Sequence, residues 1–224
     1  MSWFQLDPST LACRARSEGS DARVPSLLGS IARGIFGFTL VSIAGFAPWA
    51  IFGRWSAANL GEAGMYAACA LIFIGLSGLL LHPLIMGPGS LVRFYQVFAP
   101  SFAAYAVAWV VGWLALGDPV GSALGLLVGS VAMGGMLAQA FDAGELRWKV
   151  VAALFVLNAL GYFAGGWIAS LVLALAGVPL AQHAQAMLAK LLWGVSYGIG
   201  FGAGLGLAFH LCQTDARAML SAES

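Results

Sequence analysis

Apolar residues fill six long stretches of the chain, and short polar or glycine- and proline-containing segments separate them. Each stretch has about 20 to 27 residues, which at about 1.5 Å per helical residue is enough to cross a hydrocarbon core of about 30 Å. We therefore predict an all-α fold, a polytopic membrane helical bundle with six transmembrane helices. The predicted helices are Ile31–Phe52, Ala63–Ile85, Val97–Leu116, Val120–Phe141, Val150–Ala176 and Met187–Cys212.

The segments between these helices differ in length and composition. Only Gly117, Asp118 and Pro119 join the third helix to the fourth, so we expect these two helices to form an antiparallel hairpin. The segment His82–Gln96 contains two prolines and two glycines, which is typical of a turn. This assignment places Pro100 in the first turn of the third helix, where proline is tolerated.

Both ends of the chain are more polar than its middle. We divide it into an N-terminal cytoplasmic or interfacial segment, 1–30, a transmembrane domain, 31–212, and a cytoplasmic tail, 213–224. The first segment lacks the apolar core and small-residue cleavage site of a signal peptide. We expect it to be solvated or to rest at the membrane interface, and docking on the bundle or on a partner stays open.

Lysine and arginine residues fall unevenly on the two sides of this topology. Two of them, Arg54 and Lys190, lie on one side and eight lie on the other. Because basic residues collect in cytoplasmic loops, we expect both termini in the cytoplasm, and a bacterial inner membrane as the location. The eight residues are Arg14, Arg16, Arg23, Arg33, Arg93, Arg147, Lys149 and Arg217.

Glycines four residues apart recur in the last three predicted helices and give each helix one narrow face. Such faces let helices approach closely in a bilayer, so we expect these three helices to pack as one unit, with the first three more peripheral. We further expect Gly202→Leu to prevent stable assembly and Leu205→Ala to be tolerated. The expected packing residues are Gly121, Gly125, Gly129, Gly161, Gly165, Gly194, Gly198, Gly202 and Gly206.

Composition narrows the function classes. Hydrophobic residues make up 61% of the chain and charged residues 8%, and the few basic residues are scattered, which argues against nucleic-acid binding. The three cysteines, Cys13, Cys69 and Cys212, have neither CxxC spacing nor a disulfide pattern, so we predict no metal site. No acidic or basic residue lies centrally in any predicted span, which disfavours an ion-coupled transporter.

Two histidines are candidate ligands. His82 and His210 lie near the ends of the second and sixth predicted helices, at the same expected edge of the membrane. Two imidazoles from facing helices can bind haem, so haem or another pigment is one interpretation. Interfacial histidines that bond to headgroups or loop backbone are the commoner case, and we predict no cofactor.

The sequence GLSG at 75–78 resembles the string around the nucleophile of rhomboid intramembrane proteases. A serine nucleophile needs a base within about 3 Å. Ser77 lies about 12 Å inside its helix end, His210 lies only a few Å inside its own, and His82 follows on the same helix. We therefore interpret Ser77 as a packing residue and expect no enzyme activity.

A few other polar residues fall inside the predicted spans or at their edges. Asn158 and Tyr162 are one turn apart in the fifth helix, with Tyr105 and Tyr197 in the third and sixth. They can hold helices together by hydrogen bonds or face a ligand or pore. Arg93 can contact an anionic lipid or a partner carboxylate, or serve as a cytoplasmic anchor.

Two functions fit these features. The first is a non-catalytic structural or accessory subunit that packs against other membrane proteins, lipids or hydrophobic cofactors. The second is a small oligomeric channel or facilitator for a small solute or ion, with the glycine face of the sixth helix near the pathway. Both predict membrane lipids and other integral membrane proteins, or further copies of the chain, as partners.

Overall fold

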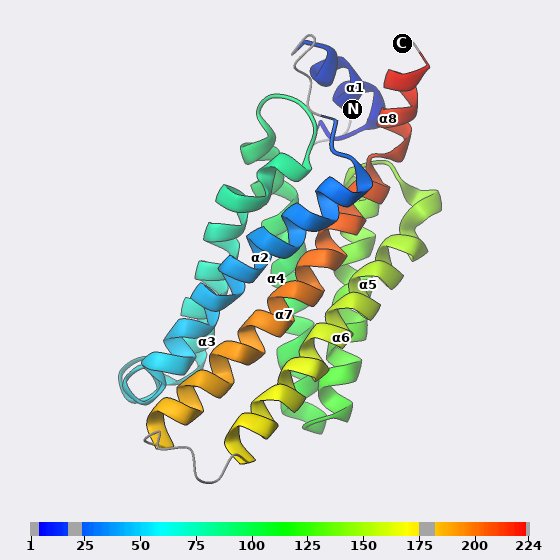
Figure 1. The fold of residues 1–224 in the computed structure, drawn as a ribbon. Coiled ribbons are helices and arrows are strands. Elements are labelled where there is room, and N and C mark those ends of the chain that lie inside the picture. The colour runs from blue at the N-terminus through cyan, green and yellow to red at the C-terminus, as the bar shows by residue number, and fades with distance from the viewer. Residues whose placement is uncertain (1–4, 18–23, 175–181, 223–224) are drawn as a thin grey trace.

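The computed structural model describes residues 5–17, 24–174 and 182–222, and all regular structure in these ranges is helical. Six long helices lie alongside one another, and two short helices cover one end of them (Figure 1). The elements are α1 (Pro8–Ser17), α2 (Leu27–Ile51), α3 (Gly53–Leu81), η2 (His82–Leu84), α4 (Ser90–Leu116), α5 (Val120–Ala140), η3 (Gly144–Leu146), α6 (Arg147–Ala174), α7 (Gln182–Cys212) and α8 (Thr214–Ser221).

The six long helices are long and apolar enough to cross a membrane. The chain is therefore a multi-pass membrane protein with an all-α helical bundle, and this prediction is confirmed. The first and last helices, α1 and α8, lie together at one end of the bundle (Figure 1). Their cytoplasmic placement stays a prediction, and Arg23, one of the basic residues behind it, lies outside the described residues.

The turn expected over His82–Gln96 is much shorter in the structure, because α4 begins at Ser90 instead of Val97. Gly87 and Gly89 adopt positive φ angles of 76° and 73°, and the chain turns there rather than over the whole segment to Gln96. Pro100 consequently lies well inside α4. Transmembrane helices tolerate such a proline because other groups satisfy the freed backbone positions.

The described part of the N-terminal segment contains the helix α1, which packs against the rest of the chain on one side. Leu6 and Leu11 are buried, and α1 contacts α8 at the end of the bundle. Ala216 supplies the buried position of α8. The helix α1 thus docks on the C-terminal helix of its own chain, and α2 begins at Leu27, inside the segment assigned to 1–30.

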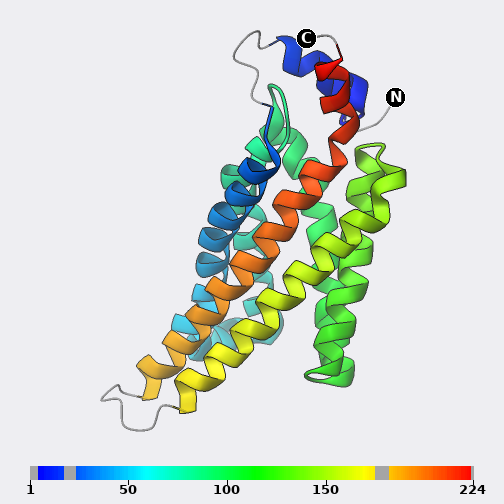
Figure 2. The ribbon, with the colours of Figure 1, turned by 45° about the vertical axis from the view of Figure 1, so that its right-hand side comes forward.

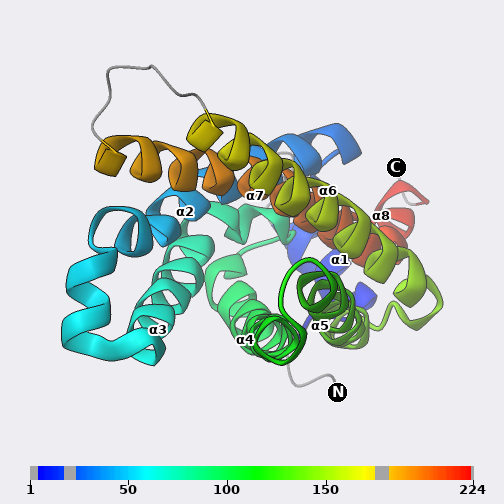
Figure 3. The ribbon, with the colours of Figure 1, turned by 90° about the horizontal axis from the view of Figure 1, so that it is seen from below.

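The long helices form two layers. In the view from below, α2, α7 and α6 lie side by side in one layer, and α3, α4 and α5 lie across from them (Figure 3). Figure 2 shows α7 between α2 and α6, and α7 packs against both of these helices. The helix α2, expected to be peripheral, is therefore one of the two main partners of α7.

Glycine contacts explain how closely α7 approaches its neighbours. A Cβ atom added to Gly202 would overlap the carbonyl oxygen of Gly34 on α2, and one added to Gly206 would overlap that of Ser30. On the other side of α7, Gly200 lies against Gly161 of α6. We call these two contact surfaces the glycine seams.

The glycines of α5 serve a different pair of helices. Gly121, Gly125 and Gly129 all face α4, where they meet Gly112, Trp109 and Tyr105. The short linker thus produces the expected hairpin, and the glycine face of α5 is used inside it. The helices α5, α6 and α7 do contact one another in that order, but the glycines of α5 face α4, since equal spacing does not identify the partner helix.

Candidate binding cavity

A cavity of about 320 Å³ lies between the two layers, near the C-terminal end of α2 and the N-terminal part of α7. Its described walls come from α2, α3, α4, α6, α7 and the linker before α5. Eleven of the seventeen lining residues are aromatic, so flat apolar rings form most of its surface. They are Phe46, Trp49, Tyr66, Phe73, Phe102, Tyr105, Trp109, Trp113, Tyr162, Trp193 and Tyr197.

The aromatic side chains of this cavity pack against one another as well as around the space. Trp193 of α7 makes edge-to-face contacts with Trp49 and Tyr162, at centroid distances of 6.1 Å and 5.3 Å. Trp109 and Trp113 are stacked 6.3 Å apart along α4. Such pairs contribute about 0.5–1.5 kcal/mol each beyond buried area, which fixes the rings as stable walls.

A buried polar cluster joins three helices beside the cavity. Asn158 of α6 donates from Nδ2 to the Tyr105 hydroxyl of α4 at 2.7 Å. The Tyr197 hydroxyl of α7 donates to the same oxygen at 3.4 Å. Three of the polar residues singled out from the sequence therefore meet, and both tyrosines also line the cavity.

A second polar group lies at the end of the cavity nearest the α4–α5 linker. The Tyr162 hydroxyl and Ser122 Oγ are 3.0 Å apart, and Ser122 Oγ donates to Asp118. Trp113 Nε1 donates to the other carboxylate oxygen of Asp118 at 3.3 Å. Asp118 is the only charged residue among the described residues that line the cavity. The sequence showed it only as part of a linker.

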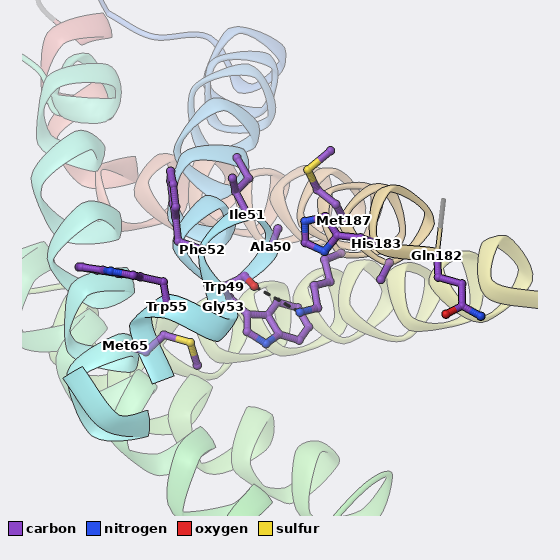
Figure 4. A pocket seen from close by; sticks show the side chains of 12 residues that line it. Trp49, Ala50, Ile51, Phe52, Gly53, Trp55, Met65, Gln182, His183 and Met187 are labelled. Carbon is purple, nitrogen blue, oxygen red and sulfur yellow. Dashed lines mark hydrogen bonds between the residues drawn. The ribbon is translucent and has the colours of Figure 1, made fainter. Parts of the chain in front are cut away.

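A neighbouring cavity of about 670 Å³ opens where α2 ends and where α3 and α7 begin (Figure 4). Lys190 Nζ donates to the Trp49 carbonyl oxygen at 3.2 Å and lies 4.2 Å from the centre of the Trp49 ring. Trp49 lines both cavities. An intramolecular cation thus already rests on an aromatic residue of the binding cavity, as expected for a cation–π contact.

The two candidate histidines lie at the other end of the bundle. His82 Nδ1 is 2.8 Å from Ser90 Oγ, across the α3–α4 connection. No hydrogen bond joins it to His210, which lies near the end of α7. Among the residues that the structure describes, no group of three histidine, cysteine or acidic side chains could hold a metal ion.

The segment at 75–78 packs α3 against α4. Ser77 is buried, and its hydroxyl has no hydrogen-bond partner in the described part of the chain. The Tyr95 hydroxyl donates to the Gly75 carbonyl oxygen, and the Tyr95 ring fills the space where Gly78 would carry a Cβ atom. Because the Ser77 hydroxyl has no partner among the described residues, neither His82 nor His210 lies within hydrogen-bond distance of it.

Arg93 is used inside the chain rather than at its surface. Only 4% of the residue is exposed, and its Nη2 donates to the carbonyl oxygens of Met86 and Gly87 at 3.2 Å and 2.9 Å. Gln213 accepts a hydrogen bond from the Met86 amide at 2.9 Å and donates to Leu84 at 2.8 Å. The two side chains hold the α3–α4 connection. A contact of Arg93 with a lipid or partner stays a prediction, because these bonds show only its role within the chain.

Comparison with family models, characterised proteins and solved structures finds no match for this chain.

Proposed function

We propose that this integral membrane protein is non-catalytic, and that its aromatic cavity holds the apolar part of a lipid or another hydrophobic molecule. The aromatic lining carries this proposal, since eleven of seventeen lining residues present rings. At about 320 Å³ the cavity is at the small end of the about 300–1,000 Å³ typical of ligand sites. It suits one chain or ring system rather than a bulky cofactor.

Binding in this cavity would be driven by van der Waals contact with the walls rather than by removal of apolar surface from water. A guest that enters from the bilayer already has an apolar environment, so burial alone provides little driving force. Rigid ring walls offer denser van der Waals contact than mobile lipid chains, and each contact adds about 0.1–0.2 kcal/mol. A guest whose shape matches the cavity is thereby favoured over bulk lipid.

The accessory role with other membrane proteins is part of the same proposal. Trp148 and Trp167 of α6 are both 66% exposed, and they give its outer face large apolar side chains for lipid or a partner. In our proposal this face contacts other integral membrane proteins or another copy of the chain. The termini lie in the cytoplasm of a bacterial cell, as the distribution of basic residues indicates.

A pathway along the glycine face of α7 has less support. Gly194 and Gly198 face Phe46 and Thr39 of α2, and Gly202 faces Gly34. Within one chain, α2 therefore covers the surface on which the channel hypothesis relied. We retain the binding function because the cavity lies elsewhere, between the layers.

The test is to purify the protein gently and identify its co-purifying lipids and small molecules by native mass spectrometry. Ala106→Phe introduces a ring into the cavity wall, whereas Ala103→Phe on the same helix adds a ring at an exposed position. We expect the wild type and Ala103→Phe to retain a bound molecule, and Ala106→Phe to lose at least nine-tenths of it. Equal occupancy in all three proteins would disprove binding in this cavity.

A further inference from the structure

We propose that the molecule held in the cavity is an organic cation, a quaternary ammonium group on an apolar chain, with its charge beside Asp118. The inference rests on the proposed function and adds the chemistry of the ligand. It comes from the combination of an aromatic cavity with a single carboxylate at one end.

The carboxylate of Asp118 is held in place by hydrogen bonds, and it has no cationic partner in the described part of the chain. Trp113 Nε1 and Ser122 Oγ donate to its two oxygens, which fixes the direction of the group. Within the described residues, no lysine, arginine or histidine side chain forms an ion pair with it. Lys190 lies in the neighbouring cavity, bound to Trp49. A ligand is therefore free to supply the positive charge.

The rings nearest to Asp118 suit the same charge. Trp109 and Trp113 stack with an interplanar angle of 11°, and Tyr162 meets Trp109 at 68°. Aromatic faces attract a quaternary ammonium ion through their quadrupole, and recognition of choline-type groups relies on such rings. Because these ions cannot donate hydrogen bonds, moving them from water to the rings breaks no donor hydrogen bonds, and a nearby carboxylate can offset the loss of hydration of the charge.

The cavity is also long in one direction. Its lining on α4 runs from Phe102 to Trp113, which corresponds to about 16 Å at 1.5 Å per residue. Phe73 of α3 lines it together with Phe102, and the two rings are 5.6 Å apart. An apolar chain can extend from Asp118 toward this end, which favours an amphiphile over a compact cation.

Two sources offer this chemistry, the headgroup end of a choline lipid and a free alkylammonium compound. The test uses the full chain in nanodiscs of phosphatidylglycerol, which has no ammonium group, with empty nanodiscs as the blank. Decyltrimethylammonium is titrated by tryptophan fluorescence, beside its uncharged isostere with carbon in place of nitrogen. Repeating the titration with added phosphatidylcholine distinguishes the sources, because a choline lipid that occupies the site competes.

We expect the cation to bind at least tenfold more tightly than the uncharged isostere. Asp118→Asn keeps an oxygen that can accept from Ser122, and it should reduce this preference to less than threefold. Asp142→Asn is the matched control, since Asp142 is exposed like Asp118 but lies outside the cavity lining, at the α5–η3 connection. Its preference should equal that of the wild type.

The outcomes separate the two proposals. Equal binding of cation and isostere by the wild-type protein would overturn the charge inference and leave the hydrophobic cavity supported. An unchanged preference in Asp118→Asn would also overturn it, because the carboxylate would then have no role. Absence of binding by either compound would overturn the proposed function itself. The wild-type comparison needs no variant, so it holds even if Asp118→Asn folds poorly.

Discussion

The helix α7 takes part in two kinds of interface. Along its glycine seams, Gly200, Gly202 and Gly206 bring its backbone against α6 and α2. On its other side, Trp193 and Tyr197 line the aromatic cavity. Small residues close one interface, and large rings keep the other open.

The difference follows from the size of the side chains. Where glycines face each other, nothing separates the two backbones, and van der Waals contact becomes continuous. Where tryptophans and tyrosines meet edge to face, ring centres stay about 5–6 Å apart and leave gaps that a packed interior would fill. The seams thus provide stability and allow the cavity to remain unfilled.

The largest expected effect comes from placing a bulky side chain in a glycine seam. Gly202→Leu should prevent stable folding, because a Cβ atom there already overlaps the backbone of Gly34. Gly75→Leu is the control, since a Cβ atom at Gly75 meets no other atom within 4 Å. Size-exclusion yield in detergent should fall to background for the first variant only. A monodisperse Gly202→Leu protein with the wild-type melting temperature would show that the seam is not tight.

A second effect concerns the apolar packing between the seams. Leu205 is fully buried in the hydrophobic core. We therefore expect Leu205→Ala to destabilise the protein, in contrast to the expectation from the sequence. Loss of a buried leucine costs about 2–5 kcal/mol, and we expect that reduction in unfolding free energy. Leu160→Ala is the comparison, because Leu160 is 62% exposed. If denaturant titration gives equal losses for the two variants, Leu205 is not a core residue.

The smallest effect tests the polar cluster at the cavity wall. Asn158→Leu removes the hydrogen bond to the Tyr105 hydroxyl and should lower the unfolding free energy by about 0.6–2 kcal/mol. Replacing Tyr105 by Phe in the same background should cost less than it does alone, because the bond to Asn158 is already lost and only the longer bond to Tyr197 remains to be broken. Fully additive losses in this double-mutant cycle would mean that the two side chains do not interact.

The sequence predicts the six spans well because long apolar runs have few alternatives in a membrane. It predicts partner helices poorly. Gly121 and Gly202 have the same four-residue spacing, yet one faces α4 and the other faces α2. Spacing shows which face of a helix is narrow, and the identity of its neighbour depends on how the whole bundle folds.

The cavity is still harder to predict from sequence. Its rings come from five helices, so that Phe46 and Trp193 are far apart in the chain and adjacent only in the fold. Asn158 and Tyr197 could be recognised as unusual polar residues in apolar spans. Asp118 could not, because an aspartate in a short linker is ordinary until its contact with Trp113 is known.

The native cysteines allow the most direct test of the central claim, that the aromatic cavity is accessible to small molecules while the packed core is not. Cys69 lines the cavity, Cys212 is buried, and Cys13 is exposed. An uncharged organomercurial, with modification followed by peptide mass spectrometry, should label Cys13 and Cys69 and leave Cys212 unmodified. Filling the cavity by Ala106→Phe should slow Cys69 labelling at least tenfold without changing Cys13. An accessible cavity would be contradicted if Cys69 were labelled as slowly as Cys212, or if Ala106→Phe left the labelling rate of Cys69 unchanged.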